Sequence, residues 1–202
     1  MDNKMNNIFV AIGEHLFLAY SALFVAIVIA IPLAVISLYN RYLSSILLIL
    51  ANLAQAIPSF AVVAIVVPLL GIGFKPAILA IILRIILPLF KNTYTGLKNI
   101  DDAYIDSAKG IGLNERVILL YVRFPNAYPA IFAGIKFAAV IANSVAIITS
   151  LIGAGGLGEF IYEGLSNLNM TKVLRGAIPA IIIAILLDVG FTFIEKKFTL
   201  EK

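Results

Sequence analysis

The stretch DSAKGIGLNERVILLYVRFP, residues 106–125, is a polar interval in a chain that is otherwise strongly apolar. Just before it, Asp101 is well placed to cap a short helix that we predict over residues 103–110, where an acidic group also favours the helix dipole. Gly110 and Gly112 are suited to end that helix, because glycine accepts the left-handed backbone of a helix C-terminus.

The second half of the interval predicts another short helix in the same way. Asn114 is a good N-cap for a helix over residues 115–122, and Pro125 is expected to end it. The whole interval, about residues 101–125, therefore predicts a helix–turn–helix hairpin. Its mixture of apolar and charged residues suits either docking to a partner or packing as an ordinary loop on its own helices.

Outside this interval the composition predicts an integral membrane protein with an all-α fold. Of the 202 residues, 62% are hydrophobic and only 13% are charged, and the mean hydropathy is +1.06. A soluble protein of this size has no means of burying so much apolar surface. Nothing at the N-terminus resembles a cleavable signal peptide, so we expect the first span to stay in the mature chain. The apolar runs predict five spans, at about residues 16–38, 46–70, 77–90, 129–152 and 173–194.

The connecting segments predict the orientation of these spans. Nine positive residues fall on the side of the hairpin: Arg41, Lys91, Lys98, Lys109, Arg116, Arg123, Lys196, Lys197 and Lys202. Four fall on the other side: Lys4, Lys75, Lys172 and Arg175. Because positive residues favour the cytoplasmic side, we expect a cytoplasmic hairpin, an extracellular segment 1–12, a transmembrane domain 13–195 and a cytoplasmic tail 196–202.

Several kinds of chemistry are excluded or disfavoured by the residue types. The chain has no Cys and a single histidine, His15, which we interpret as a polar residue at the membrane interface. No zinc motif, catalytic triad or paired carboxylate is present, which disfavours a membrane enzyme. A G-x-x-x-x-G-K-[ST] loop is also missing, so this chain cannot be an ATPase. The net charge of +4 is too small to indicate a nucleic-acid partner. A transport subunit and a membrane anchor without a pathway both remain open.

Polar residues within the predicted spans are candidates for a translocation pathway, because such residues are costly in a bilayer and tend to face a cavity or a partner. The alternative is packing between helices through small and polar residues. The second and fourth spans contain six of them: Gln55, Ser59, Asn143, Ser144, Thr149 and Ser150.

Arg84 stands in the middle of the third predicted span, where an unpaired guanidinium would be expensive. Three interpretations are open: contact with the carboxylate of a substrate, an ion pair with Asp188 of the fifth span, or snorkelling towards the interface. Lys136, two turns into the fourth span, is expected to snorkel.

The segment LIGAGGLGEF, residues 151–160, has the G-x-G-x-x-G spacing of a dinucleotide site. That fingerprint requires a preceding strand, a following helix and an acidic residue about 20 positions later, and a membrane span precedes it here. We therefore expect the glycines to permit a tight backbone at the outer end of the fourth span. They are Gly153, Gly155, Gly156 and Gly158.

The hairpin also carries a specific resemblance. Its sequence resembles the coupling motif of binding-protein-dependent ABC permeases, E-A-A, three residues, Gly, nine residues, I-x-L-P. Asp106, Ser107 and Ala108 stand at the E-A-A, Gly112 at the glycine and residues 122–125 at the I-x-L-P. The spacing is intact, and the departures, including Asp for Glu, Ser for Ala and Phe for Leu, are conservative.

Further stretches are similar to the osmoprotectant branch of these permeases, which import glycine betaine, carnitine or choline: GEHLFLAYSAL, QAIPSFAVVAIVVPLLGIG, LPLFKNTYTGLKNID and SLIGAGGLGEFI. The resemblance covers about residues 13–195 and implies a type I importer permease fold. Methionine permeases share the five-span plan and are the alternative.

The resemblance also implies partners and roles. It implies a cytoplasmic ATPase that binds ATP and magnesium, an extracellular substrate-binding protein, and a second copy or sister permease beside this chain in the lipid membrane. This chain itself would need no cofactor or metal. The glycine segment would be an outer gate or receptor-docking surface. The residues expected to contact the ATPase are Asp106, Ser107, Ala108, Gly110, Gly112 and Pro125.

Overall fold

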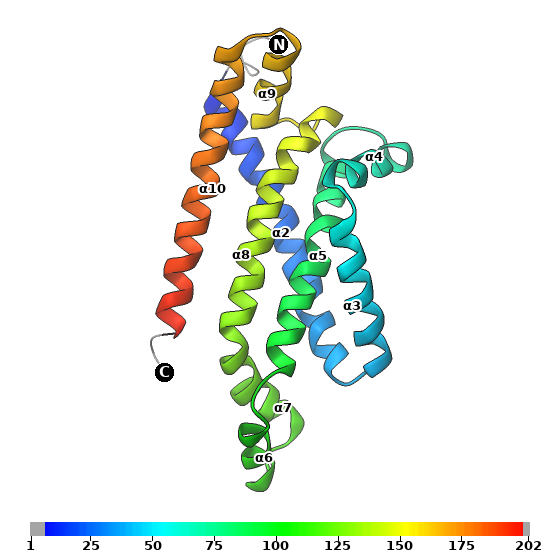
Figure 1. Cartoon of the computed structure of the whole chain (residues 1–202), viewed down its shortest axis with the longest axis vertical. Coiled ribbons are helices and arrows are strands. Elements are labelled where there is room, and N and C mark those ends of the chain that lie inside the picture. Colours follow the sequence, from blue (N-terminus) through cyan, green and yellow to red (C-terminus); the bar gives the residue numbers. More distant parts are fainter. Residues whose placement is uncertain (1–6, 200–202) are drawn as a thin grey trace.

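The structure, a computed structural model, describes residues 7–199, with side chains as far as residue 194. This part of the chain contains helices and no strand, which confirms the predicted all-α class (Figure 1). The elements are α2 Ile8–Leu38, α3 Arg41–Ala56, α4 Ser59–Leu70, α5 Phe74–Lys98, α6 Asp102–Gly110, α7 Glu115–Ile118, the π-helical turn η1 Leu119–Arg123, α8 Phe124–Thr149, the 3₁₀ turn η2 Ser150–Ile152, α9 Leu157–Ser166 and α10 Met170–Thr199.

Three helical segments in the described part are long and apolar enough to cross a membrane: Ile8–Leu38, Glu115–Ile152 and Met170–Ile194. The number rises to four if the bent pair α3–α4 is counted as one span. The predicted count of five spans stays a prediction. α2 begins at Ile8, inside the predicted extracellular segment 1–12, and α10 continues through Thr199 into the predicted tail 196–202. Residues 1–6 and 200–202 of those segments lie outside the described residues.

The predicted second span is broken rather than continuous. α3 and α4 meet at an angle of 102°, with Ile57 and Pro58 in extended conformations between them. A residue before proline is pushed out of the helical region, so the Ile57–Pro58 pair ends α3 at this point. α4 then turns aside from the bundle near its upper end (Figure 1).

The core of the bundle lies between α2, α5 and α8. The buried face of α2 presents alanines at a spacing of four residues, Ala22, Ala26, Ala30 and Ala34, all with 0% exposure. At the contact between α5 and α8, a Cβ added to Gly96 would lie 2.5 Å from the Cβ of Ala130. Small residues of this kind let membrane helices approach closely, and they explain how three long helices pack with little room between them.

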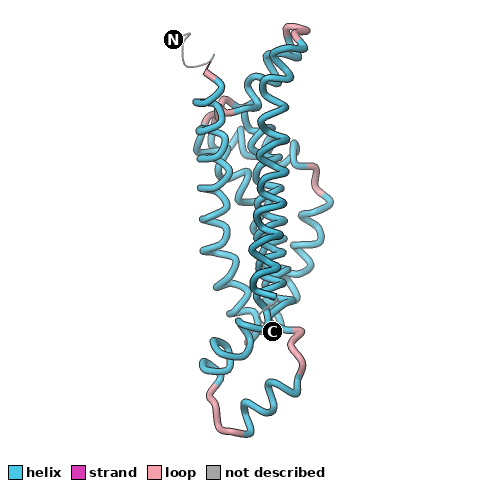
Figure 2. Tube along the Cα trace, turned by 90° about the vertical axis from the view of Figure 1, so that its left-hand side faces the viewer, coloured by secondary structure: helices cyan, strands magenta, loops and turns pink. Residues whose placement is uncertain are grey.

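The two ends of the bundle are different in character. The hairpin α6–α7 lies at one end, together with the C-terminal part of α10, while the start of α2 and the glycine segment before α9 lie at the other (Figures 1 and 2). The start of α2 and the C-terminal part of α10 thus lie at opposite ends of the bundle, and the predicted placement of the termini on opposite sides of a membrane stays a prediction.

Candidate functional site

The first helix of the hairpin is capped as its sequence predicts. The Asp101 Oδ1 accepts a hydrogen bond from the backbone N–H of Ala103 at 2.9 Å. Gly112 has a φ of +82°, and the N–H groups of Gly112 and Leu113 donate to the carbonyls of Lys109 and Ala108. These paired bonds form a Schellman motif, in which the left-handed residue is at Gly112. Gly110 is the last residue of α6, so of the two glycines it is Gly112 that has the left-handed backbone.

The second helix differs from its predicted form, because Pro125 does not end it. The Asn114 side chain caps α7 at the N–H of Val117, as expected, but the chain then continues through η1 directly into α8. In this wider turn the N–H of Phe124 donates to the carbonyl of Leu119, five residues earlier. Pro125 follows directly after this turn and has no N–H to donate to the helix, so the change of hydrogen-bond register in η1 lies where the ordinary pattern would lose a bond.

The hairpin has a small core and an exposed outer face. Ile105, Ala108 and Ile118 are buried against one another, so Ala108 stabilises the hairpin from inside. Asp106 and Ser107 are exposed on the same helix. The hairpin thus packs on itself through these residues and leaves other side chains exposed, and docking to a partner stays a prediction. Large apolar side chains exposed on it are Tyr104, Ile111, Leu120 and Tyr121.

At the opposite end, the glycine segment is fixed to the start of α2. Gly153, Gly155 and Gly156 all have positive φ angles. The backbone N–H of Gly156, at the N-terminus of α9, donates to Glu14 Oε2 at 3.2 Å. A carboxylate is favourable at that position because the helix dipole is positive there. The sequence offered no signal for Glu14, since this contact joins residues that are far apart in the chain.

A hollow of about 300 Å³ opens beside this contact, lined in part by Glu14, Gly155, Glu159 and Phe160. Partial burial raises the pKa of the Glu159 carboxyl, and the nearby carboxylates of Glu14 and Glu163 raise it further. This end of the bundle is therefore acidic as well as rich in glycine. Gly158 lies within α9, where an added Cβ would overlap the Ser150 hydroxyl and the Ile147 carbonyl.

The polar residues of the predicted fourth span do not share one environment. Asn143 is buried, and its Oδ1 lies 2.8 Å from Nε2 of His15. His15 has no exposed surface and is packed inside the protein, and its predicted position at the membrane interface stays a prediction. Thr149 and Ser150 are buried and donate to carbonyls of their own helix, whereas Ser144 is exposed. Of these four residues, only Ser144 has an exposed side chain.

Arg84 joins the broken helix pair to α5. Its Nε donates to the Ser59 hydroxyl at 3.0 Å, and its Nη1 donates to the Ala54 carbonyl at 3.3 Å. Carbonyls in the last turn of a helix lack partners within the helix, so Arg84 satisfies one at the end of α3. The alternative of an ion pair between Arg84 and Asp188 is wrong. Gln55 lies exposed beside this contact.

Asp188 is paired with Lys136 instead, at 2.7 Å between Oδ1 and Nζ. Lys136 Nζ also donates to the hydroxyl of Thr192 at 2.8 Å, so the lysine does not snorkel away from the bundle as predicted. The pair links α8 to α10. In the apolar stretch of α10, only 6% of the residues are buried by the rest of the chain.

These features can now be compared with known proteins. Residues 22–200 match the protein family described as "Binding-protein-dependent transport system inner membrane component". The chain belongs to this family. It is a transport permease of the ABC importer class rather than an enzyme, and permeases of this class work with an ATPase and a substrate-binding protein.

Named relatives of this permease cover most of its length. It is 36% identical to the "Glycine betaine/carnitine/choline transport system permease protein OpuCB" of Bacillus subtilis (strain 168), over 93% of this chain and 86% of that protein. It is 40% identical to the "Carnitine transport permease protein OpuCD" of Listeria monocytogenes, over 88% of this chain and 80% of that protein. These matches agree with the predicted osmoprotectant branch.

A solved structure described as "Inward facing conformations of the MetNI methionine ABC transporter" has the same fold. Its TM-score is 0.84 at 19% identity, over 98% of this permease and 99% of that chain. At this identity the likeness speaks for the fold alone. The helical hairpin and the broken helix pair therefore belong to an ABC importer permease fold.

Proposed function

We propose that this permease imports a compatible solute carrying a quaternary ammonium group: glycine betaine, carnitine or choline. The observation that carries the proposal is the identity of 36–40% with permeases named for these solutes, over 88% or more of the chain. The alternative substrate, methionine, is favoured by a likeness of fold at 19% identity. A sequence identity of 36–40% is a better guide to the substrate than a shared fold at 19% identity.

The hairpin is the proposed contact with the ATPase, which would bind the ATP and magnesium. Asp106 and Ser107 supply an exposed polar surface, and Gly112 fixes the turn between the two short helices. Because α7 runs through η1 into α8 without a loop, a movement of the hairpin is passed directly along Glu115–Ile152 to the glycine segment. One continuous helical path thus joins the proposed ATPase contact to the proposed outer gate.

The solute pathway is proposed to lie between two permeases, either two copies or this chain and a sister subunit. Ser144 and Gln55 are exposed on one copy and are the best candidates for its lining, while Ser59, Asn143, Thr149 and Ser150 support the helices behind it. The glycine segment is the proposed docking surface for the substrate-binding protein. We also propose that the hairpin and the C-terminus are cytoplasmic. A reporter fused to the C-terminus that is active only outside the cell should therefore give no signal, and a signal would contradict this orientation.

The substrate is tested by binding to the partner substrate-binding protein, measured by calorimetry with glycine betaine, carnitine, choline and methionine. Binding of one or more of the three quaternary ammonium solutes, with methionine below detection, is expected. Uptake of the bound solute by cells that express the complete system, and not by cells lacking this permease, completes the test. Methionine binding alone would overturn the substrate assignment and leave the permease assignment unchanged.

A further inference from the structure

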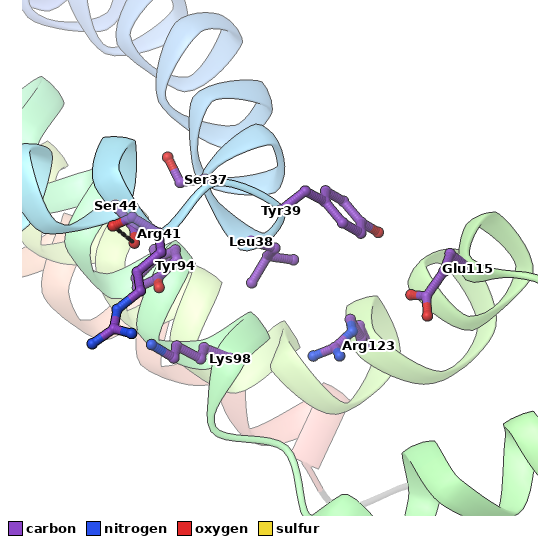
Figure 3. A pocket seen from close by; sticks show the side chains of 9 residues that line it. All are labelled: Ser37, Leu38, Tyr39, Arg41, Ser44, Tyr94, Lys98, Glu115 and Arg123. Atoms are coloured by element: carbon purple, nitrogen blue, oxygen red, sulfur yellow. Dashed lines mark hydrogen bonds between the residues drawn. The ribbon is translucent and has the colours of Figure 1, made fainter.

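The end of the bundle that carries the hairpin contains a hollow of about 660 Å³ (Figure 3). This volume lies within the usual range for sites that bind small molecules and cofactors. The end of α2, the start of α3, the end of α5 and the second hairpin helix all contribute to its wall. The polar side chains that define it are Arg41, Ser44, Tyr94, Lys98, Glu115 and Arg123.

The charge of this hollow is unbalanced. Three cations, Arg41, Lys98 and Arg123, line it together with a single carboxylate, Glu115. Glu115 Oε1 lies 3.7 Å from Nζ of Lys109, on the hairpin itself. Among the side chains that the structure describes, none of the three cations has a carboxylate within ion-pairing distance. The hollow therefore offers positive charge that the chain does not neutralise.

Two of the three cations make contacts beside the hollow. Arg123 Nη1 donates to the Leu97 carbonyl at 2.9 Å, which leaves its other N–H groups available. Lys98 Nζ lies 5.4 Å from the centroid of the Tyr94 ring. Arg41 is the first residue of α3, so the positive end of that helix dipole also lies at the hollow. In the view of Figure 3, the side-chain ends of Arg41 and Lys98 lie near each other, with Glu115 at the far side.

The position of the hollow indicates the kind of anion. It lies where the charged hairpin meets the start of α3, and α3 carries exposed apolar side chains onward from there, including Ile46, Ile49 and Leu53. A ligand with an anionic head and apolar tails would match both surfaces at once. Basic pockets at the cytoplasmic ends of membrane helices suit the head groups of anionic lipids.

We propose that this hollow binds the phosphate group of an anionic phospholipid. Arg41 and Lys98 contact the phosphate oxygens, Arg123 supports it from the hairpin, and the acyl chains lie along α3. The site would connect the lipid at the membrane surface to the hairpin through Arg123, which stands in η1. The proposal rests on the proposed function only in placing the hairpin at the cytoplasmic surface.

The test uses the full-length permease in a neutral detergent, with added phosphatidylglycerol or phosphatidylcholine, and measures retained lipid by native mass spectrometry. In the double variant Arg41→Gln/Lys98→Gln, we expect the affinity for phosphatidylglycerol to fall by about thirtyfold, because two of the charges at the membrane surface are lost. Retention of phosphatidylcholine should not change. The matched control, Lys75→Gln/Arg175→Gln, removes two charges at the other end of the bundle and should bind phosphatidylglycerol as the wild type does.

Three results would overturn the proposal. Equal retention of phosphatidylglycerol by the wild type and the Arg41/Lys98 variant would show that the hollow is not the lipid site. Displacement of the lipid by an equal concentration of inorganic phosphate would identify a site for small anions. Loss of the co-purified ATPase with unchanged lipid retention would identify a protein contact. Circular dichroism establishes that each variant is folded, and because the lipid measurement needs neither ATPase nor solute, its outcome is independent of the proposed transport function.

Discussion

At the scale of single residues, Arg84 shows how a charge can be accommodated inside an apolar helix bundle. Its guanidinium is held by the Ser59 hydroxyl and by the Ala54 carbonyl at the end of α3. The sequence identified Arg84 as unusual, but none of the three open interpretations named these partners, because the break at Ile57–Pro58 creates an unpaired carbonyl only in the folded chain. Arg84 is therefore best described as the support of the broken pair.

We predict that Arg84→Leu lowers the stability of the permease by about 1–3 kcal/mol, because a partly buried carbonyl loses its donor. Thermal unfolding followed by circular dichroism in detergent measures the change. The control is Lys75→Leu, which removes a positive charge from the exposed start of the same helix. Equal melting temperatures for the wild type and Arg84→Leu would contradict the supporting role.

The Glu159 carboxyl gives a prediction about pH. Burial and the neighbouring carboxylates of Glu14 and Glu163 raise its pKa in the folded state. The protonated form is thus favoured by folding, so this residue's contribution to stability is present at low pH and is lost as the pH rises through the raised pKa. Glu159→Gln should be more stable than the wild type at neutral pH, and the difference should disappear on acidification.

Melting temperatures measured between pH 4 and pH 8 test this prediction. Glu163→Gln is the matched control, because the Glu163 carboxylate is paired with Lys172 and its removal should not stabilise the chain. If Glu159→Gln raises the melting temperature by the same amount at every pH, the gain in stability does not come from removing the carboxylate charge.

At the scale of elements, the C-terminal end of α8 is packed against α9 through glycine. Gly158 leaves no room for a Cβ beside the Ile147 carbonyl and the Ser150 hydroxyl. We predict that Gly158→Ala costs about 1–3 kcal/mol, as expected for overpacking. Gly13→Ala, in the open surroundings of α2, should instead be neutral or slightly stabilising because alanine favours a helix.

Both variants are compared by thermal unfolding in the same detergent. If Gly158→Ala has the same melting temperature as Gly13→Ala, α8 and α9 make room for the added methyl group without cost. That result would contradict the tight contact between the two helices.

The hairpin and the glycine segment also show which features were predictable from the sequence. The caps at Asp101 and Asn114 and the turn at Gly112 depend on neighbouring residues, and all three were predicted correctly. The continuation past Pro125 was not, because the π-helical turn that permits it is a property of the assembled helix.

Contacts between distant segments were beyond sequence reasoning. His15 pairs with Asn143 in the core, and Glu14 holds the N–H of Gly156, although neither partner is near in the chain. Lys136 and Asp188 were each noticed as intramembrane charges but were not paired with each other. The predicted all-α class was confirmed, since it follows from composition and apolar periodicity, whereas the side-chain pairs require the packing itself.

At the scale of the whole molecule, the central claim is that one helical path couples the hairpin to the glycine segment at the opposite end of the bundle. Glu115–Ile152 connects them within a bundle whose long helices are closely packed through alanine and glycine. A disturbance of the turn at Gly112 should therefore break the coupling while leaving the transmembrane helices in place. Valine at Gly112 would be strained, because its φ is +82°.

The most direct measurement is the ratio of solute imported to ATP hydrolysed, in vesicles that contain the permease, its ATPase and its loaded substrate-binding protein. For Gly112→Val we predict at least a tenfold fall in this ratio, with normal insertion of the protein, while Gly13→Val should keep the wild-type ratio. An unchanged ratio for Gly112→Val would contradict the account.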